Sequence, residues 1–171
     1  MEQKMFTQIS PDELGNAMKL IGKDWMLIVA RDEQGNKVNG MTASWGFLGV
    51  MWNKNVAVCM IRPQRYTYGL VEAADRVSLA FLSEEYRDAL RLCGSRSGRD
   101  GDKLAEVGLT TEELDGVPVI QEADTVVICR KLYADDLKKD GFLDPSLLAH
   151  YKQEDYHRMY VCEIEKVYRK V

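Results

Sequence analysis

Short apolar runs that are rich in β-branched residues recur along the chain and predict buried strands. Four of them are Trp25–Ala30, Val56–Ile61, Val77–Leu82 and Thr125–Leu132, and a partly alternating stretch, Arg158–Val167, predicts a closing strand. Directly after the first run, the Gln-Gly-Asn within Arg31–Lys37 predicts a hairpin turn. These patterns together predict a sheet of short strands.

Helical patterns lie between the strands at irregular intervals. Ser10, Pro11 and Glu13 provide a cap, a first helical residue and a capping box, and they predict a helix that ends at Gly22. Further helices are predicted at 84–93 with Gly94 as the stop, at Asp102–Val107, and from Asp144 through His150. Irregularly inserted helices favour an α+β fold over a regular βαβ fold, and we expect one domain over residues 1–171.

The segment N-G-M-T-A-S-W alternates hydroxyl and apolar side chains. Thr42 and Ser44 are two residues apart, so a regular strand places both on one face. The other face then holds Met41, Ala43 and Trp45. Because a strand cannot turn both faces to one ligand, we expect this segment to be irregular or to approach a ligand with its edge.

A basic turn follows the strand predicted at residues 56–61. Pro63 favours an extended conformation at Arg62, so the strand is expected to end there. Arg62 and Arg65 flank the turn before Thr67, which is predicted to be the N-cap of the next helix. Hydroxyls, two guanidinium groups and the N–H groups of a helix start indicate a phosphate site. Taken singly, these residues are more typical of strand hydroxyls and solvated charges.

Composition and charge narrow the classes of function. A net charge of −4 over 171 residues argues against broad binding to nucleic acid or to an anionic membrane. No apolar run approaches the roughly 20 residues that span a bilayer, and the N-terminus lacks a signal-peptide core, so we expect a cytoplasmic protein. The four Cys form no C-x-x-C pair, so we expect buried, reduced thiols and no metal site.

Four motifs, in this order along the chain, resemble the flavin reductase-like family of FMN-binding split-barrel proteins, and its flavoredoxin-like branch most closely. They are N-x-M-T-x-S-W, R-P-x-R-Y-T, GSRSGRDGDKLAEVGLT at 94–110, and DYHRMYVCEI at 155–164. The resemblance covers roughly residues 9–167. It implies a six-stranded split β-barrel with Greek-key connections and flanking helices. It also implies FMN as the cofactor, and a homodimer with the flavin near the subunit interface.

The resemblance, combined with the residue chemistry, gives a set of candidate cofactor contacts. These are Asn39, Met41, Thr42, Ala43, Ser44, Trp45, Arg62, Arg65, Thr67 and Lys103. Backbone groups of 41–45 are expected at the polar edge of the flavin ring. The family's S-G-R-D-x-D-K pattern implies that Lys103 lies near the flavin, whereas a mobile, solvated loop is the alternative.

His157 is the candidate catalytic residue. The family pattern G-D-H, four residues, then G-E-V implies that this imidazole faces the flavin or an incoming nicotinamide. Here Tyr156 stands in place of the Asp, and Cys162 in place of the glycine. A structural role at the start of the closing strand is the alternative, and His150 is a weaker candidate.

Three classes of function follow from these patterns. The first is an oxidoreductase that moves hydride from NAD(P)H through FMN to free flavin or another acceptor. The second is a flavoredoxin-like carrier that exchanges electrons with protein partners, and the third is a split-barrel binding module without flavin. The sequence holds no G-x-G-x-x-G motif, so NAD(P)H would bind on the flavin face, and NADH is not distinguished from NADPH.

The apolar stretch at 45–52 bears on association. It contains more apolar side chains than one strand edge is expected to expose, namely Trp45, Phe47, Leu48, Val50, Met51 and Trp52. Two-fold pairing would cover this surface.

Overall fold

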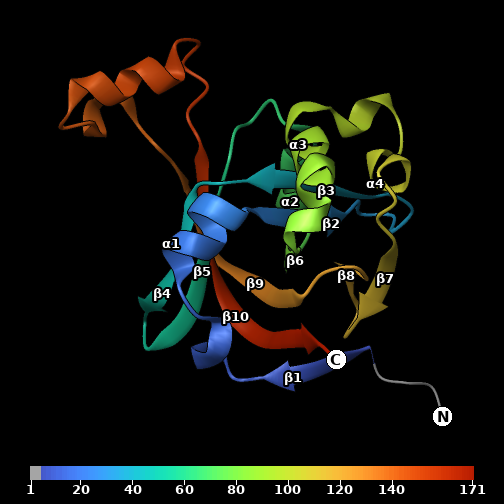
Figure 1. The fold of residues 1–171 in the computed structure, drawn as a ribbon. Helices are drawn as coiled ribbons and strands as arrows, with labels where there is room; N and C mark the ends of the chain where they lie inside the picture. The colour runs from blue at the N-terminus through green and yellow to red at the C-terminus, as the bar shows by residue number, and fades with distance from the viewer. Residues whose placement is uncertain (1–4) are drawn as a thin grey trace.

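An eight-stranded antiparallel sheet organises the computed structural model, which describes residues 5–171 (Figure 1). The strands follow the order β3-β2-β6-β9-β10-β5-β4, and β1 pairs with β10. Within the described residues no ladder joins β3 to β4, so the sheet is an open, split barrel with these two strands at its ends. This confirms the predicted α+β split barrel, with eight strands in the sheet where the resemblance implied six.

The strands are longer and more numerous than the apolar runs alone predicted. The main sheet contains β1 (Phe6–Ile9), β2 (Met26–Arg31), β3 (Val38–Ala43), β4 (Gly46–Met51), β5 (Lys54–Ile61), β6 (Arg76–Phe81), β9 (Thr125–Asp136) and β10 (Arg158–Lys170). A separate hairpin pairs β7 (Thr111–Leu114) with β8 (Val117–Ile120). Each predicted strand is present. The short strands β1, β7 and β8 were not predicted, and β4 lies within the apolar stretch at 45–52.

Two of the three apolar clusters, one on each face of β2, explain its continuous apolar run. On β2, Ile28 faces the barrel interior with residues of β6, β9 and β10. The alternate residues Leu27 and Val29 face the opposite cluster, which includes Leu90 of α3 and Leu104 of α4. A strand that is buried on both faces has no polar face, so its sequence does not alternate.

Short helices and turns surround the sheet. The α-helices are α1 (Ala17–Lys19), α2 (Tyr66–Ala73), α3 (Arg87–Ser95) and α4 (Lys103–Glu106). The 3-10 turns are η1 (Pro11–Leu14), η3 (Glu84–Tyr86), η4 (Gly98–Asp100), η5 (Lys139–Gly141) and η6 (Pro145–Tyr151), and η2 (Leu20–Asp24) is a π-type turn. None of the helices in residues 5–171 has the length and apolar character to cross a membrane.

Three predicted helix boundaries are wrong. The predicted helix from Ser10 to Gly22 is interrupted at Gly15, where φ is +85°, although the capping box at Ser10 is present. Arg65, not Thr67, is the N-cap of α2, because Thr67 is drawn into the core by a hydrogen bond. Helix α3 continues through Gly94 to Ser95, since Gly94 has an ordinary helical backbone there.

Residues 137–157, which we call the arm, connect β9 to β10. The arm carries η5 and η6 and projects from the sheet at the upper left of Figure 1. The predicted helix after Asp144 is a 3-10 turn, with the Asp144 side chain accepting from the Ser146 N–H. The arm returns beside the ends of β3 and β5, and so contributes to the site described next.

The four cysteines lie in the two apolar clusters. Cys59, Cys129 and Cys162 line the barrel interior, and Cys93 lies on the buried face of α3. All four are buried and free, as predicted.

Candidate functional site

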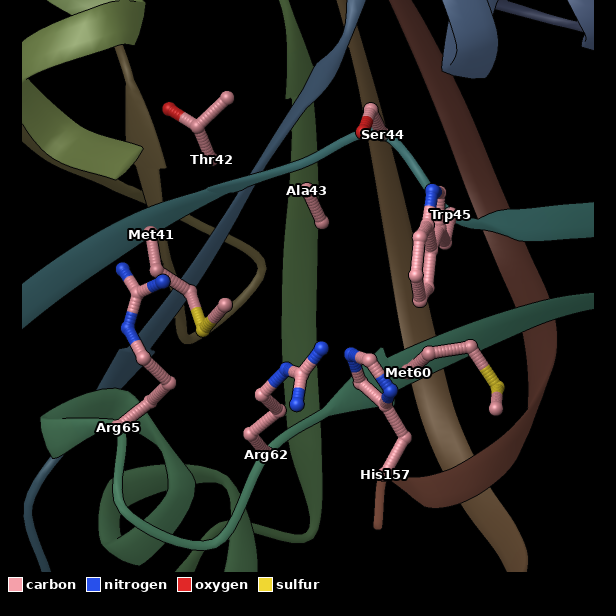
Figure 2. A pocket seen from close by; sticks show the side chains of 9 residues that line it. All are labelled: Met41, Thr42, Ala43, Ser44, Trp45, Met60, Arg62, Arg65 and His157. Atoms are coloured by element: carbon pink, nitrogen blue, oxygen red, sulfur yellow. The ribbon is translucent and has the colours of Figure 1, made fainter. Parts of the chain in front are cut away.

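A pocket of about 190 Å³ lies at the split of the barrel, between the end of β3 and the end of β5. Its lining residues are Met41, Thr42, Ala43, Ser44, Trp45, Met60, Arg62, Arg65 and His157 (Figure 2). The structure thus brings together eight of the residues that the sequence singled out, and it adds Met60.

Alternate side chains of β3 face the pocket, and the outer edge of the strand has backbone groups available to a ligand. Figure 2 shows the side chains of Met41, Ala43 and Trp45 on the side of the two arginines, with Thr42 and Ser44 turned the other way. The Thr42 hydroxyl donates to the carbonyl of Leu90 at 2.5 Å and is therefore already used. In the described residues β3 pairs only with β2, so its outer edge has backbone groups available to a ligand.

Gly46 fixes the position of Trp45 at the mouth of the pocket. Its φ is +149°, and a Cβ there would lie 2.5 Å from the carbonyl oxygen of Val58. Only glycine can therefore occupy position 46, where β4 begins to pair with β5. The chain crosses the split in the two residues between β3 and β4, which leaves the Trp45 ring half exposed beside the pocket.

The two arginines of the pocket have different partners. Arg62 forms an ion pair with Asp155 at 2.7 Å and donates to the carbonyl of His150, so it clasps the arm to the end of β5. Arg65 forms no ion pair with a carboxylate among the described residues, and it contacts only the carbonyl of Cys93 at 3.5 Å. Burial lowers the pKa of Arg65. Arg65 is thus the cation with more capacity for an added anion.

His157 lies where the arm enters β10, and it is only 8% exposed. Its Nδ1 lies 2.7 Å from the hydroxyl of Tyr151, and its ring lies 5.2 Å from that of Trp45, which also meets His150 edge-on. Burial, and then the charge of Arg62, lower the pKa of His157 to about 4. The imidazole is therefore neutral at neutral pH and can donate or accept one proton in a hydrogen bond.

Three candidate residues lie behind the pocket instead of in its lining. The Asn39 amide donates to the Thr67 hydroxyl at 2.9 Å, and both side chains are buried. The Lys103 ammonium donates to the carbonyls of Cys93 and Arg96, each at 2.9 Å, at the end of α3. Burial lowers the pKa of Lys103 to about 8. Contact between these residues and FMN stays a prediction.

Gly98 packs closely against Asn39, one of these buried polar residues. A Cβ at Gly98 would lie 2.6 Å from both the Asn39 amide nitrogen and the Tyr66 ring. The Lys37 ammonium donates to the Gly98 carbonyl at 2.9 Å and lies over the Tyr66 ring. The glycine-rich loop is thus packed against β3 and α2. This differs from the alternative of a mobile, solvated loop.

Tyr151 is a residue of the site that the sequence did not indicate. It is the buried residue of η6, and it belongs to no recognised motif. Its contact with His157 depends on how the arm folds back on itself. The only signal in the sequence was aromatic content near His157, at Phe142 and Tyr156, which pack beside it.

The sequence matches one family. Residues 18–170 match the family described as flavin reductase like domain, in agreement with the resemblance carried by the four motifs. Among curated proteins, none matches the chain.

Solved structures with the same fold come from several organisms. An FMN-binding domain of a flavin reductases-like enzyme from Shewanella baltica OS155 shares 16% identity over 96% of this chain and 77% of that chain, with a TM-score of 0.68. Flavoredoxin of Desulfovibrio vulgaris (Miyazaki F) shares 18% identity over 92% and 75%, with a TM-score of 0.67. An NADH:FAD oxidoreductase from Streptomyces globisporus C-1027, in complex with NAD and FAD fragments, shares 16% over 85% and 74%, with a TM-score of 0.63.

Proposed function

The chain belongs to the flavin reductase-like family, and from this premise we propose that it is an FMN-binding oxidoreductase. We assign to it the transfer of hydride from NAD(P)H, through FMN, to free flavin or another acceptor, which is the chemistry that FMN supplies when bound. The observation that carries the proposal is the pocket at the barrel split. It combines a cation, an available strand edge and a neutral imidazole.

The residues of the pocket fit the three parts of FMN. A phosphate needs charge and donors, and Arg65 at the start of α2 offers both, together with the first N–H groups of that helix. A flavin ring needs a flat apolar surface, which Met41, Met60 and Trp45 can supply. The polar edge of the ring needs donors and acceptors, which the backbone of 41–45 can provide.

Each part of the pocket has a role in this proposal. Arg65 binds the phosphate, and Arg62 holds the arm against the site. The β3 edge orients the ring, and Trp45 excludes water from one side of the pocket. His157 faces the space that remains and presents a neutral hydrogen-bonding group to the donor or acceptor.

A second candidate is a carrier that exchanges electrons with protein partners. It is favoured by the fold shared with flavoredoxin and by the departures at Tyr156 and Cys162 from the family pattern. Both candidates use FMN and the same pocket. They differ in whether NADH or NADPH reduces the protein directly.

We also propose that the protein is a homodimer. Phe47, Val50 and Trp52 are 53%, 74% and 51% exposed, and an apolar groove runs from them to β10. Trp45, which lines the pocket and is itself exposed, directly precedes β4, so a second copy of the chain would cover the apolar face beside the flavin site. Light scattering at micromolar concentration tests the assignment, and a monomer would reject it.

Absorbance and single-turnover kinetics test the function. The purified protein is expected to be yellow, or to bind added FMN tightly, and to be reduced by NADH or NADPH in a stopped-flow experiment. Steady-state oxidation of NAD(P)H with free FMN then separates the reductase from the carrier. A protein that neither contains nor binds FMN would instead be a binding module on this fold.

A further inference from the structure

We propose that Tyr151 is a positioning residue for His157: its phenol donates to Nδ1, places the imidazole proton on Nε2, and so presents an N–H donor to the pocket. The inference rests on the proposed function, because the donor acts on whatever reacts there. It gives the arm, which lies outside the barrel strands, the role of orienting His157.

The geometry of the pair supports a strong and isolated hydrogen bond. The Tyr151 hydroxyl and Nδ1 of His157 are 2.7 Å apart, and the two side chains are 6% and 8% exposed, so water does not compete. A phenol is a stronger acid than a neutral imidazole N–H, which favours the arrangement O–H···N. The hydrogen bond at one ring nitrogen then sets the tautomer at the other.

The second nitrogen of His157 faces the pocket. The two nitrogens of an imidazole point in divergent directions, so a bond from Nδ1 to the arm leaves Nε2 for the pocket that His157 lines. Figure 2 shows the ring between Trp45 and the guanidinium of Arg62. The ring cannot exchange its nitrogens without breaking the bond to Tyr151 and leaving a buried acceptor unpaired.

Tyr151 is itself held in place. Arg62 lies over its ring, with the guanidinium carbon 4.9 Å from the ring centroid, and the rings of Phe142 and Tyr156 pack against it. Asp155 accepts from Arg62 and from Gln64, which closes the arm onto the body. Burial raises the pKa of Tyr151, so its hydroxyl keeps its proton at neutral pH.

Nitrogen-15 NMR of the two histidines in flavin-free protein tests the tautomer directly. In the parent we expect His157 to carry its proton on Nε2, with assignment by comparison with His150→Gln. Tyr151→Phe keeps the ring and its packing but removes the donor, so we expect mixed tautomers at His157. Tyr156→Phe is the matched control, because the Tyr156 hydroxyl makes no hydrogen bond within the described residues. A proton on Nδ1 in the parent, or an unchanged tautomer in Tyr151→Phe, would overturn the proposal.

Flavin reduction by NAD(P)H provides the second measurement. Tyr151→Phe is expected to slow reduction about tenfold, while FMN affinity and melting temperature stay near those of Tyr156→Phe. Equal reduction rates in both variants would overturn the positioning role and leave the proposed function intact. Should neither NADH nor NADPH reduce the parent, the proposed donor fails, and the NMR result alone decides whether Tyr151 positions His157.

Discussion

Two groups of polar residues flank β3, and they differ in what their polar atoms face. Arg65 and His157 line an open pocket. Asn39, Thr67 and Lys103 lie behind it, with their polar atoms bonded to one another or to backbone carbonyls. One motif, R-P-x-R-Y-T, supplies both Arg65 and Thr67, so membership of a motif does not distinguish a ligand contact from a residue that builds the wall behind the ligand.

The difference predicts opposite responses to substitution. A buried polar atom that loses its partner destabilises the fold by the cost of leaving the other group unsatisfied. Removing the charge of a pocket residue should leave the stability of the flavin-free protein nearly unchanged and weaken ligand binding. Measuring stability and flavin affinity on the same variants therefore tests the distinction.

Lys103→Met should give the largest effect. Two carbonyls at the end of α3 lose a charged donor, and we expect the free energy of unfolding to fall by about 3 kcal/mol. Denaturant unfolding of the flavin-free protein measures the loss. Lys37→Met is the control, because Lys37 donates to one carbonyl from a less buried position and should cost less. If Lys103→Met unfolds like the parent but no longer binds FMN, the lysine is a cofactor ligand and the distinction fails.

Arg65→Ala should weaken FMN by about 1.5–3 kcal/mol, the range for a hydrogen bond to a charged group, which is roughly 10- to 150-fold in Kd. Its guanidinium has no carboxylate partner among the described residues, so the flavin-free protein should keep its stability. Flavin fluorescence titration measures the affinity.

Arg62→Ala is the comparison for Arg65. It breaks the bonds to Asp155 and to the His150 carbonyl, so we expect a loss of stability as well as weaker FMN binding. An FMN affinity that falls only in Arg62→Ala would move the phosphate from Arg65 to Arg62.

Thr67→Val should cost about 1–2 kcal/mol of stability. The substitution keeps the volume but leaves the buried Asn39 amide without its acceptor. The FMN affinity of the folded variant should match that of the parent. Thr7→Val, at an exposed position of β1, is the control and should change neither quantity. A drop in affinity with unchanged stability would return Thr67 to the list of cofactor contacts.

Much of the fold was predictable from the sequence, because strands that are buried on both faces leave continuous apolar runs. The pocket residues were also predictable, since Arg65 and the segment 41–45 lie in recognisable motifs. The alternation of Thr42 and Ser44 against their neighbours indicated that one ligand could meet only one face of a regular strand. The sequence offered their hydroxyls to a phosphate, whereas the structure places the Thr42 hydroxyl against α3.

The remainder depends on tertiary contacts and backbone conformations that local sequence patterns do not encode. Asn39 meets Thr67 across 28 positions, and Lys103 meets the end of α3, so neither burial is visible in local sequence. Tyr151 reaches His157 only because the arm doubles back on itself. Gly15 interrupts the first predicted helix because its φ is positive. Neither the capping box nor the apolar spacing indicates that backbone conformation.

The smallest expected effect is a pH dependence of stability, which arises from His157, a residue of the pocket. Burial and the nearby charge of Arg62 lower the pKa of His157 to about 4, against about 6.5 when unfolded. Between these values the unfolded chain binds more protons, so stability decreases as the pH falls, by up to about 1.4 kcal/mol per pH unit.

The groups that face His157 are Tyr151, Arg62 and Asp155, and Asp155 partly offsets the effect of Arg62. Relative to His157→Gln, the parent should lose about 1 kcal/mol between pH 6.5 and 5.5. Urea unfolding of both proteins at several pH values measures the difference, with His150→Gln as the control. Parallel stability curves for the parent and His157→Gln would mean that the imidazole titrates as in water, and that the arm does not shield it.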